Sequence, residues 1–146
     1  MRILGIDYGE RRIGVAVCDE LGMTAQGVGT IVRKNRDADL AALAGYIERF
    51  GAEKIVVGYP LRWDGSEGIQ CEKVNRFVAR LQKRFPIPVI HRDETCSTKE
   101  AEELLRETGV RREKRRGIVD RLAASIILQG YLDDLARRGK SGEAAP

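Results

Sequence analysis

The chain has 146 residues, of which 42% are hydrophobic and 33% are charged, and its formal net charge at pH 7 is +4. This length suits one domain of ordinary size, and this composition excludes an intrinsically disordered chain. No apolar stretch approaches the ~20 residues that a membrane span needs, so we expect no membrane partner. The mildly basic balance is compatible with a polyanionic partner without requiring one.

The cysteines indicate a cytoplasmic protein. Cys18, Cys71 and Cys96 are odd in number and far apart, without the paired spacing of a zinc site. They are typical of reduced thiols rather than of disulfides. The N-terminus enters a predicted strand at once, so no signal peptide is visible.

The first two elements are predicted to form a hairpin. The apolar run from Ile3 to Ile6 ends at Asp7, and an alternating run follows from Ile13 to Cys18. The segment 8–12 would be the turn. A charged aspartate at the end of a buried strand is costly unless it is paired or binds a cation. The alternative is an aspartate that accepts hydrogen bonds from turn amides.

The middle of the chain predicts alternating strands and helices. Residues 24–32 predict a third strand, antiparallel and near an edge of the sheet. A helix should follow, with Asp37 as its N-cap and Gly51 at its end. Residues 54–58 predict a buried strand parallel to the first. The loop after it contains Trp63, the only tryptophan, which is either a core residue or an exposed platform for a nucleobase.

The second half predicts another helix around residues 74–85 and a strand over 89–94 that ends in Asp93 and Glu94. Ser97 and Glu100 have the spacing of a capping box, which predicts a further helix. Asp120 is expected to open the last helix. We expect one domain over residues 1–137 and a flexible tail over 138–146. The fold class is therefore α/β: a five-stranded mixed sheet, with three antiparallel hairpin strands, two parallel strands and helices on both faces.

The acids predict a metal site. Asp7, Glu94 and Asp120 stand at strand or helix ends, and converging carboxylates repel one another unless a cation neutralises them. An all-oxygen cluster suits Mg²⁺ or Mn²⁺ rather than Zn²⁺. Each acid also has a simpler explanation, such as a favourable position of Asp120 near a helix N-terminus.

Basic residues near these acids could contact a phosphate backbone. The segment 111–116 is either a solvated loop or part of a nucleic-acid surface. The residues predicted to bind nucleic acid are Arg11, Arg12, Trp63, Arg111, Arg112, Lys114, Arg115 and Arg116.

Four motifs in order resemble the YqgF/RuvX family, which is Holliday-junction-resolvase-like and has the RNase H fold. They are Gly5-Ile6-Asp7-Tyr8-Gly9 with Arg12-Ile13-Gly14-Val15-Ala16, Val57-Gly58-Tyr59-Pro60-Leu61 with Asp64-Gly65-Ser66, Asp93-Glu94 with Ser97-Thr98, and Asp120 with Ala123-Ala124 and Ile127-Leu128-Gln129.

The resemblance covers residues 1 to about 135 and implies a nuclease that processes the 5′ end of pre-16S rRNA in ribosome biogenesis. It also implies a two-metal phosphodiesterase site, with Asp7, Glu94 and Asp120 as metal-binding, catalytic acids. Thr95-Cys96 departs from the Arg-Leu that usually follows Asp-Glu, which removes an arginine that could touch phosphate.

Alternatives remain open at this point. A resolvase would act on branched DNA as a homodimer, whereas a monomer would argue against that activity. A non-catalytic RNA-binding assembly factor would bind structured RNA without needing Asp7 or Mg²⁺. A sugar-kinase-like or actin-like ATPase also opens with a strand, an aspartate and a hairpin, but the length leaves no room for its second domain.

Overall fold

The computed structural model describes residues 1–62, 64–94 and 112–140, with backbone only for 112–116 and 140. The elements in chain order are β1 (Ile3–Tyr8), β2 (Arg12–Cys18), β3 (Ala25–Val32), α1 (Arg36–Phe50), β4 (Lys54–Pro60), α2 (Ile69–Arg84), β5 (Val89–Glu94) and α4 (Arg112–Lys140).

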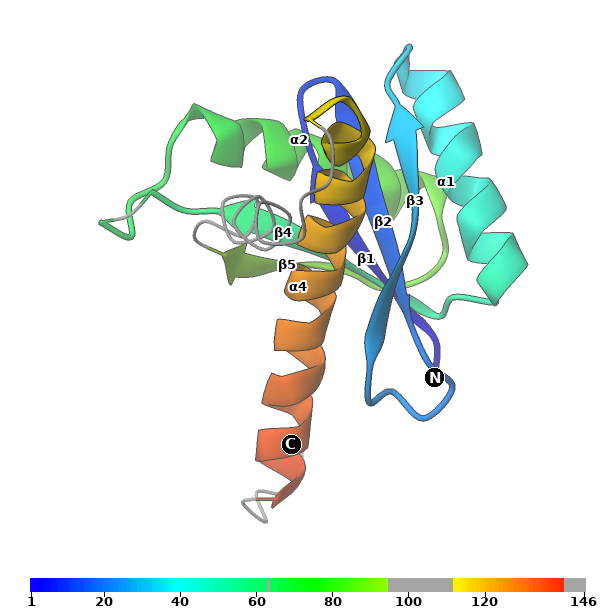
Figure 1. Ribbon diagram of the computed structural model, residues 1–146, viewed down its shortest axis with the longest axis vertical. Coiled ribbons are helices and arrows are strands. Elements are labelled where there is room, and N and C mark those ends of the chain that lie inside the picture. Colours follow the sequence, from blue (N-terminus) through cyan, green and yellow to red (C-terminus); the bar gives the residue numbers. More distant parts are fainter. Residues whose placement is uncertain (63, 95–111, 141–146) are drawn as a thin grey trace.

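The strands form the predicted five-stranded mixed sheet, in the order β3-β2-β1-β4-β5 (Figure 1). β1 pairs with β2 and β2 with β3 in antiparallel fashion, whereas β4 is parallel to β1 and β5 is parallel to β4. The parallel strands β1, β4 and β5 therefore end at one edge. This edge brings the ends of β1 and β5, with Asp7 and Glu94, to the same side of the domain.

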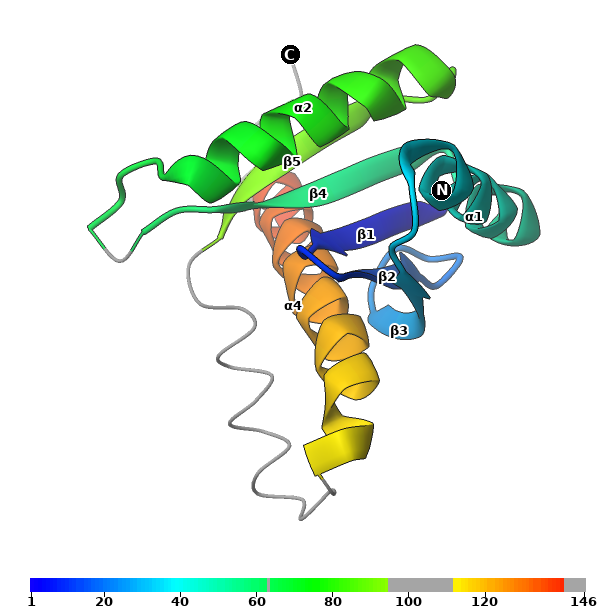
Figure 2. The same ribbon diagram turned by 90° about the horizontal axis from the view of Figure 1, so that it is seen from above.

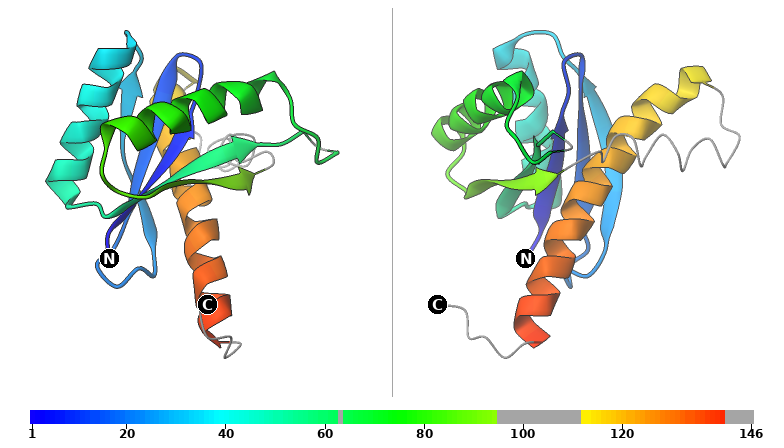
Figure 3. Two further views of the ribbon diagram at one scale, coloured as in Figure 1. Left: turned by 180° about the vertical axis from the view of Figure 1, so that it is seen from behind. Right: turned by 90° about the vertical axis from the view of Figure 1, so that its left-hand side faces the viewer.

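Helices cover both faces of the sheet, as predicted. α1 and α2 lie on one face and α4 lies on the other (Figure 2). Side chains alternate along each strand, so that Leu4 and Ile6 join the core under α1 and α2, while Ile3 packs in a second core with α4. Seen from behind and from the side, α4 crosses the strands, and its C-terminal end extends past them (Figure 3).

One predicted end of α1 differs from the structure, and the other is confirmed. Asn35, not Asp37, caps α1, because its side chain accepts a hydrogen bond from the Ala38 amide and Asp37 lies inside the first turn. Gly51 ends α1 in the left-handed conformation (φ 61°), as predicted.

The prediction that Asp120 opens the last helix is wrong. α4 begins at Arg112, so Asp120 lies eight residues further along, beyond the turn where a helix dipole acts. The basic segment is therefore helical from residue 112 rather than a loop. α4 also continues to Lys140, past the expected start of the tail. The helix predicted after Ser97 lies outside the described residues.

Glycines let α4 pack directly on the sheet. A Cβ atom at Gly14 would lie 1.9 Å from the Asp120 carbonyl oxygen, so helix backbone contacts strand backbone there. A Cβ at Gly5 would lie 2.6 Å from Leu128 Cβ, and one at Gly58 would lie 2.5 Å from Ile127 Cδ1. The close approach at Gly14 positions Asp120, because Gly14 is paired with Asp7 across the β1–β2 ladder.

We expect Gly14→Ala to lower the free energy of unfolding by about 1–3 kcal/mol, because the new methyl group overlaps the backbone of α4. Gly45→Ala is the matched control, since nothing lies within 4 Å of a Cβ there and Gly45 is inside α1. This control should gain about 0.5–1 kcal/mol. Urea unfolding of both variants tests the contact, and stabilisation by Gly14→Ala would contradict it.

Candidate active site

Asp7 lies at the end of β1 on the face covered by α4. It is two residues after Gly5, which contacts α4, so the alternation of the strand points its side chain to the same face. Burial, and secondly the negative charge of Asp120, raise the pKa of Asp7 from 3.8 to about 7. Among the described residues no side chain donates a hydrogen bond to its carboxylate. A proton or a cation is therefore needed to balance this group near neutral pH.

Asp120 is the second acid of the site, and Arg12 holds it. The Asp120 side chain is 13% exposed, and its Oδ2 accepts a hydrogen bond of 2.6 Å from Arg12 Nε. Arg12 begins β2, directly after the turn that follows Asp7. One turn earlier in α4, Thr30 Oγ1 donates to the Gly117 carbonyl oxygen at 2.7 Å, which anchors this part of the helix to β3.

Glu94, at the end of β5, is held by Arg92. Their separation of two residues puts both side chains on the face of α4, where Arg92 Nη2 also lies 2.8 Å from Asp134 Oδ2. The hydrogen bond from Arg92 is the main cause of the lowered pKa of Asp134. Asp93 lies on the opposite face of β5, two residues from His91, whose ring stacks on Tyr59 with centroids 4.3 Å apart.

The structure brings Asp7 and Asp120 together, but it does not place Glu94 with them as a ready metal cluster. No group of three or more His, Cys, Asp or Glu side chains in the described part of the chain could hold a metal ion. The ion pair with Arg92 gives a physical reason for this, because it engages the Glu94 carboxylate that would otherwise be a metal ligand. The Asp7–Asp120 pair still fits a hard cation, since both side chains offer oxygen ligands and no described side chain donates a hydrogen bond to Asp7.

The remaining predicted residues lie around or outside this site. Arg11 is exposed, whereas the Arg12 guanidinium is engaged with Asp120. Trp63 and Arg111 lie outside the described residues, and so do the side chains of Arg112, Lys114, Arg115 and Arg116. Their contact with nucleic acid stays a prediction.

Sequence reasoning missed three features of this region. The first is Gly14, whose lack of a side chain admits Asp120. The second is the link from Arg92 to Asp134, which joins residues 42 positions apart and has no local signal. The third is a set of cations on α2, at positions 73, 76 and 80, whose spacing of three and four residues could have shown that they share one helix face.

No helix in the described ranges is both long enough and apolar enough to span a membrane.

The chain is similar to proteins that are named as nucleases and resolvases. A family model described as "RuvX: Holliday junction resolvase" matches residues 1–134. A Syntrophus aciditrophicus protein named "Putative pre-16S rRNA nuclease" is 61% identical over 137 residues, covering 94% of this chain and 91% of that protein. A Halothermothrix orenii protein of the same name is 53% identical over 133 residues, covering 91% of this chain and 95% of that protein.

Solved structures confirm the RNase H-like fold. Thermus thermophilus RuvC in complex with a Holliday junction substrate aligns with a TM-score of 0.56 at 19% identity, covering 100% of this chain and 99% of that one. Fowlpox virus resolvase in complex with substrate Holliday junction DNA aligns with a TM-score of 0.51 at 12% identity, covering 92% and 99%. At these identities the likeness concerns the fold alone.

We expect Asp7 to titrate near pH 7 in the metal-free protein, which carboxyl ¹³C NMR can measure. The pKa of Asp7 is about 7 in the folded chain and 3.8 as the ordinary value. Between these two pH values the folded chain therefore binds one proton that the unfolded chain has lost. The free energy of unfolding that Asp7 contributes therefore falls as the pH rises from about 4 to about 7. Asp7→Asn should be more stable than wild type above pH 7, and this difference should vanish toward pH 4.

Asp120→Asn is the matched variant for this titration. It should lower the pKa of Asp7 but leave it above 3.8, because burial is the larger cause. An Asp7 pKa near 4 in the wild-type protein would contradict the site geometry.

Proposed function

This chain belongs to the RuvX family, and on that premise we propose that it is a metal-dependent nuclease that processes the 5′ end of pre-16S rRNA. The names of its relatives support the substrate. The observation on which the proposal rests most is the pair of carboxylates formed by Asp7 and Asp120 at the end of β1. Two acids in this position, one with a strongly raised pKa, favour cation binding over a structural role.

The residues present fit Mg²⁺ or Mn²⁺. Asp7 and Asp120 would be the first ligands, and Asp7 would lose its proton on binding. Arg12 orients the Asp120 carboxylate through Oδ2, which leaves the other oxygen of Asp120 available as a ligand. Glu94 would become a third ligand once its carboxylate separates from Arg92. Arg92 would then keep its ion pair with Asp134. We propose two ions at this site; when bound, such ions activate a water and stabilise the leaving oxygen of a phosphodiester.

A second candidate function is resolution of four-way DNA junctions. The description of the matching family model favours it. Because such a junction needs two symmetric cuts, this activity predicts a homodimer with two copies of the site. A non-catalytic RNA-binding assembly factor is the third candidate, and it predicts RNA binding that depends on neither Asp7 nor metal.

We expect Asp7→Asn to lower cleavage of end-labelled pre-16S RNA by about 100-fold or more, because loss of even an outer-shell partner of a metal costs 10–100-fold. Asp37→Asn is the matched control, since Asp37 is an exposed acid of α1 and loses the same charge. The measurement is a gel assay with Mg²⁺, Mn²⁺ or chelator, with a four-way DNA junction run in parallel.

Each pattern of cleavage distinguishes the candidates. RNA cleavage that requires metal and Asp7 supports the proposal, whereas cleavage of the junction alone favours the resolvase. RNA binding without cleavage of either substrate would favour the assembly factor. Full cleavage by Asp7→Asn would contradict the proposed site.

Metal binding can be tested without activity. We expect Mg²⁺ to raise the Tm of the wild-type protein, because a ligand that binds only the folded state stabilises it by about 2.7 kcal/mol at 100 times its Kd. Asp37→Asn should show the same rise and Asp7→Asn should show much less. An equal rise in all three proteins would mean that the cation binds elsewhere.

A further inference from the structure

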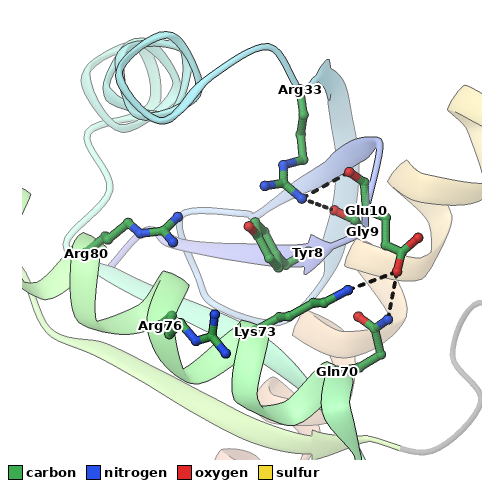
Figure 4. A pocket seen from close by; sticks show the side chains of 8 residues that line it. All are labelled: Tyr8, Gly9, Glu10, Arg33, Gln70, Lys73, Arg76 and Arg80. Atoms are coloured by element: carbon green, nitrogen blue, oxygen red, sulfur yellow. Dashed lines mark hydrogen bonds and ion pairs between the residues drawn. The ribbon is translucent and has the colours of Figure 1, made fainter.

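A second charged site lies on the opposite face of the same strand end. Here a cavity of about 380 Å³ opens between α2, the β1–β2 turn and the chain after β3 (Figure 4). Tyr8 lies at its centre, next to Asp7 in sequence but on the face of α1 and α2. We call this cavity the Tyr8 pocket. In Figure 4, Arg33 lies on one side of Tyr8, and Lys73, Arg76 and Arg80 of α2 lie on the other.

Several contacts hold the residues at the base of the Tyr8 pocket. The Tyr8 ring stacks on Phe77 of α2 with centroids 4.0 Å apart, and the Arg33 guanidinium carbon lies 4.5 Å from the centroid of the Tyr8 ring. Arg33 Nη1 donates to the Gly9 and Glu10 carbonyl oxygens at 3.0 Å each, which fixes the turn. These contacts hold Tyr8 and Arg33 in place, whereas the Arg76 side chain is 69% exposed.

The cations of the Tyr8 pocket are only partly neutralised. Lys73 Nζ lies 3.1 Å from Glu10 Oε1, and Arg33 Nε lies 3.6 Å from Asp39 Oδ2 without a hydrogen bond. In the described part of the chain, the one ion pair of Arg76 is an exposed contact of 3.8 Å with Glu72 of its own helix. Within the described residues Arg80 has no hydrogen-bond or ion-pair partner, and Arg36 lines a small cavity beside it.

This chemistry matches a phosphate group. Guanidinium groups present paired N–H donors whose geometry suits phosphate oxygens, and three arginines face one cavity. The volume is within the range of small-molecule sites, and so it accommodates a phosphate with its sugar. An uncharged or cationic ligand would leave the charge of Arg76 and Arg80 unbalanced.

The position of the Tyr8 pocket indicates which phosphate it takes. Asp7 and Tyr8 are neighbours whose Cα atoms are about 3.8 Å apart, so the pocket and the candidate active site share one strand end. A nucleic-acid strand has a phosphate at every nucleotide and can contact both faces as it crosses this edge. We propose that the Tyr8 pocket binds a backbone phosphate of the nucleic-acid substrate, next to the phosphate cleaved at Asp7. This proposal rests on the proposed nuclease function.

Binding in chelator tests this without requiring cleavage. In an Asp7→Asn background, fluorescence anisotropy would measure the Kd of labelled pre-16S RNA across salt concentrations. We expect Arg76→Gln/Arg80→Gln to weaken binding about tenfold and to reduce the slope of log K against log salt by about 0.7 per lost phosphate contact. The matched control is Lys83→Gln/Arg84→Gln, which removes two charges from exposed residues at the end of the same helix.

We expect less than a twofold change in Kd for the control, and equal thermal melting of both double variants. If both double variants weaken RNA binding equally, the effect comes from overall charge, and the proposal is wrong. A parallel titration with a nucleoside monophosphate separates the sources of phosphate. If the Arg76→Gln/Arg80→Gln variant loses binding of the free nucleotide while its RNA Kd is unchanged, the pocket does not serve the backbone.

This test is independent of the nuclease assay. Dependence of RNA binding on Arg76 and Arg80 would support the Tyr8 pocket even if no cleavage is found. Conversely, the protein could cleave RNA with metal while substitution of Arg76 and Arg80 leaves its RNA affinity unchanged. That result would support the proposed function and contradict phosphate binding in the Tyr8 pocket.

Discussion

The candidate active site depends on one backbone contact, between the Asp120 carbonyl oxygen and Gly14 of β2. A side chain at position 14 would meet that oxygen at 1.9 Å, so only glycine lets α4 lie this close to the sheet. Because Gly14 is paired with Asp7, the contact sets the separation of the two acids. Packing therefore holds the two carboxylates close together despite their repulsion. Arg12 neutralises the charge of Asp120 through a hydrogen bond to Oδ2. The close approach thus contributes to the raised pKa of Asp7, whose larger cause is burial.

Two neighbouring residues divide the end of β1 into unlike environments. Asp7 faces a second acid, and no described cation lowers its pKa, whereas Tyr8 faces a cavity lined by arginines and a lysine. The alternation of a strand is sufficient to separate these environments by the thickness of the sheet. Negative charge that attracts a cation and positive charge that attracts a phosphate can thus coexist at one edge. Each would otherwise neutralise the other.

Much of the fold could be predicted from sequence, because buried β-branched runs and helical stripes are local patterns. The number and directions of the strands, the edge position of β3 and the acids at the strand ends followed from these patterns and from the family resemblance. The N-cap at Asn35 was missed because Asp37 is an equally good capping residue two positions later. The start of α4 was missed because a run of arginines resembles a solvated loop. The link from Arg92 to Glu94 and Asp134 could not be predicted, since it depends on the crossing of α4 over β5.

The length of α4 has a mechanical consequence. Asp120 and Asp134 are 14 residues apart on one continuous helix, which is about 21 Å of axial rise. One of these acids lies beside Asp7 and the other holds Arg92, which in turn holds Glu94. Glycine contacts at Gly14, Gly5 and Gly58 pack this helix directly on the sheet between the two acids. One continuous helix therefore spans both the Asp7–Asp120 pair and the ion pairs that engage Glu94, so the two ends of the sheet face share a single supporting element.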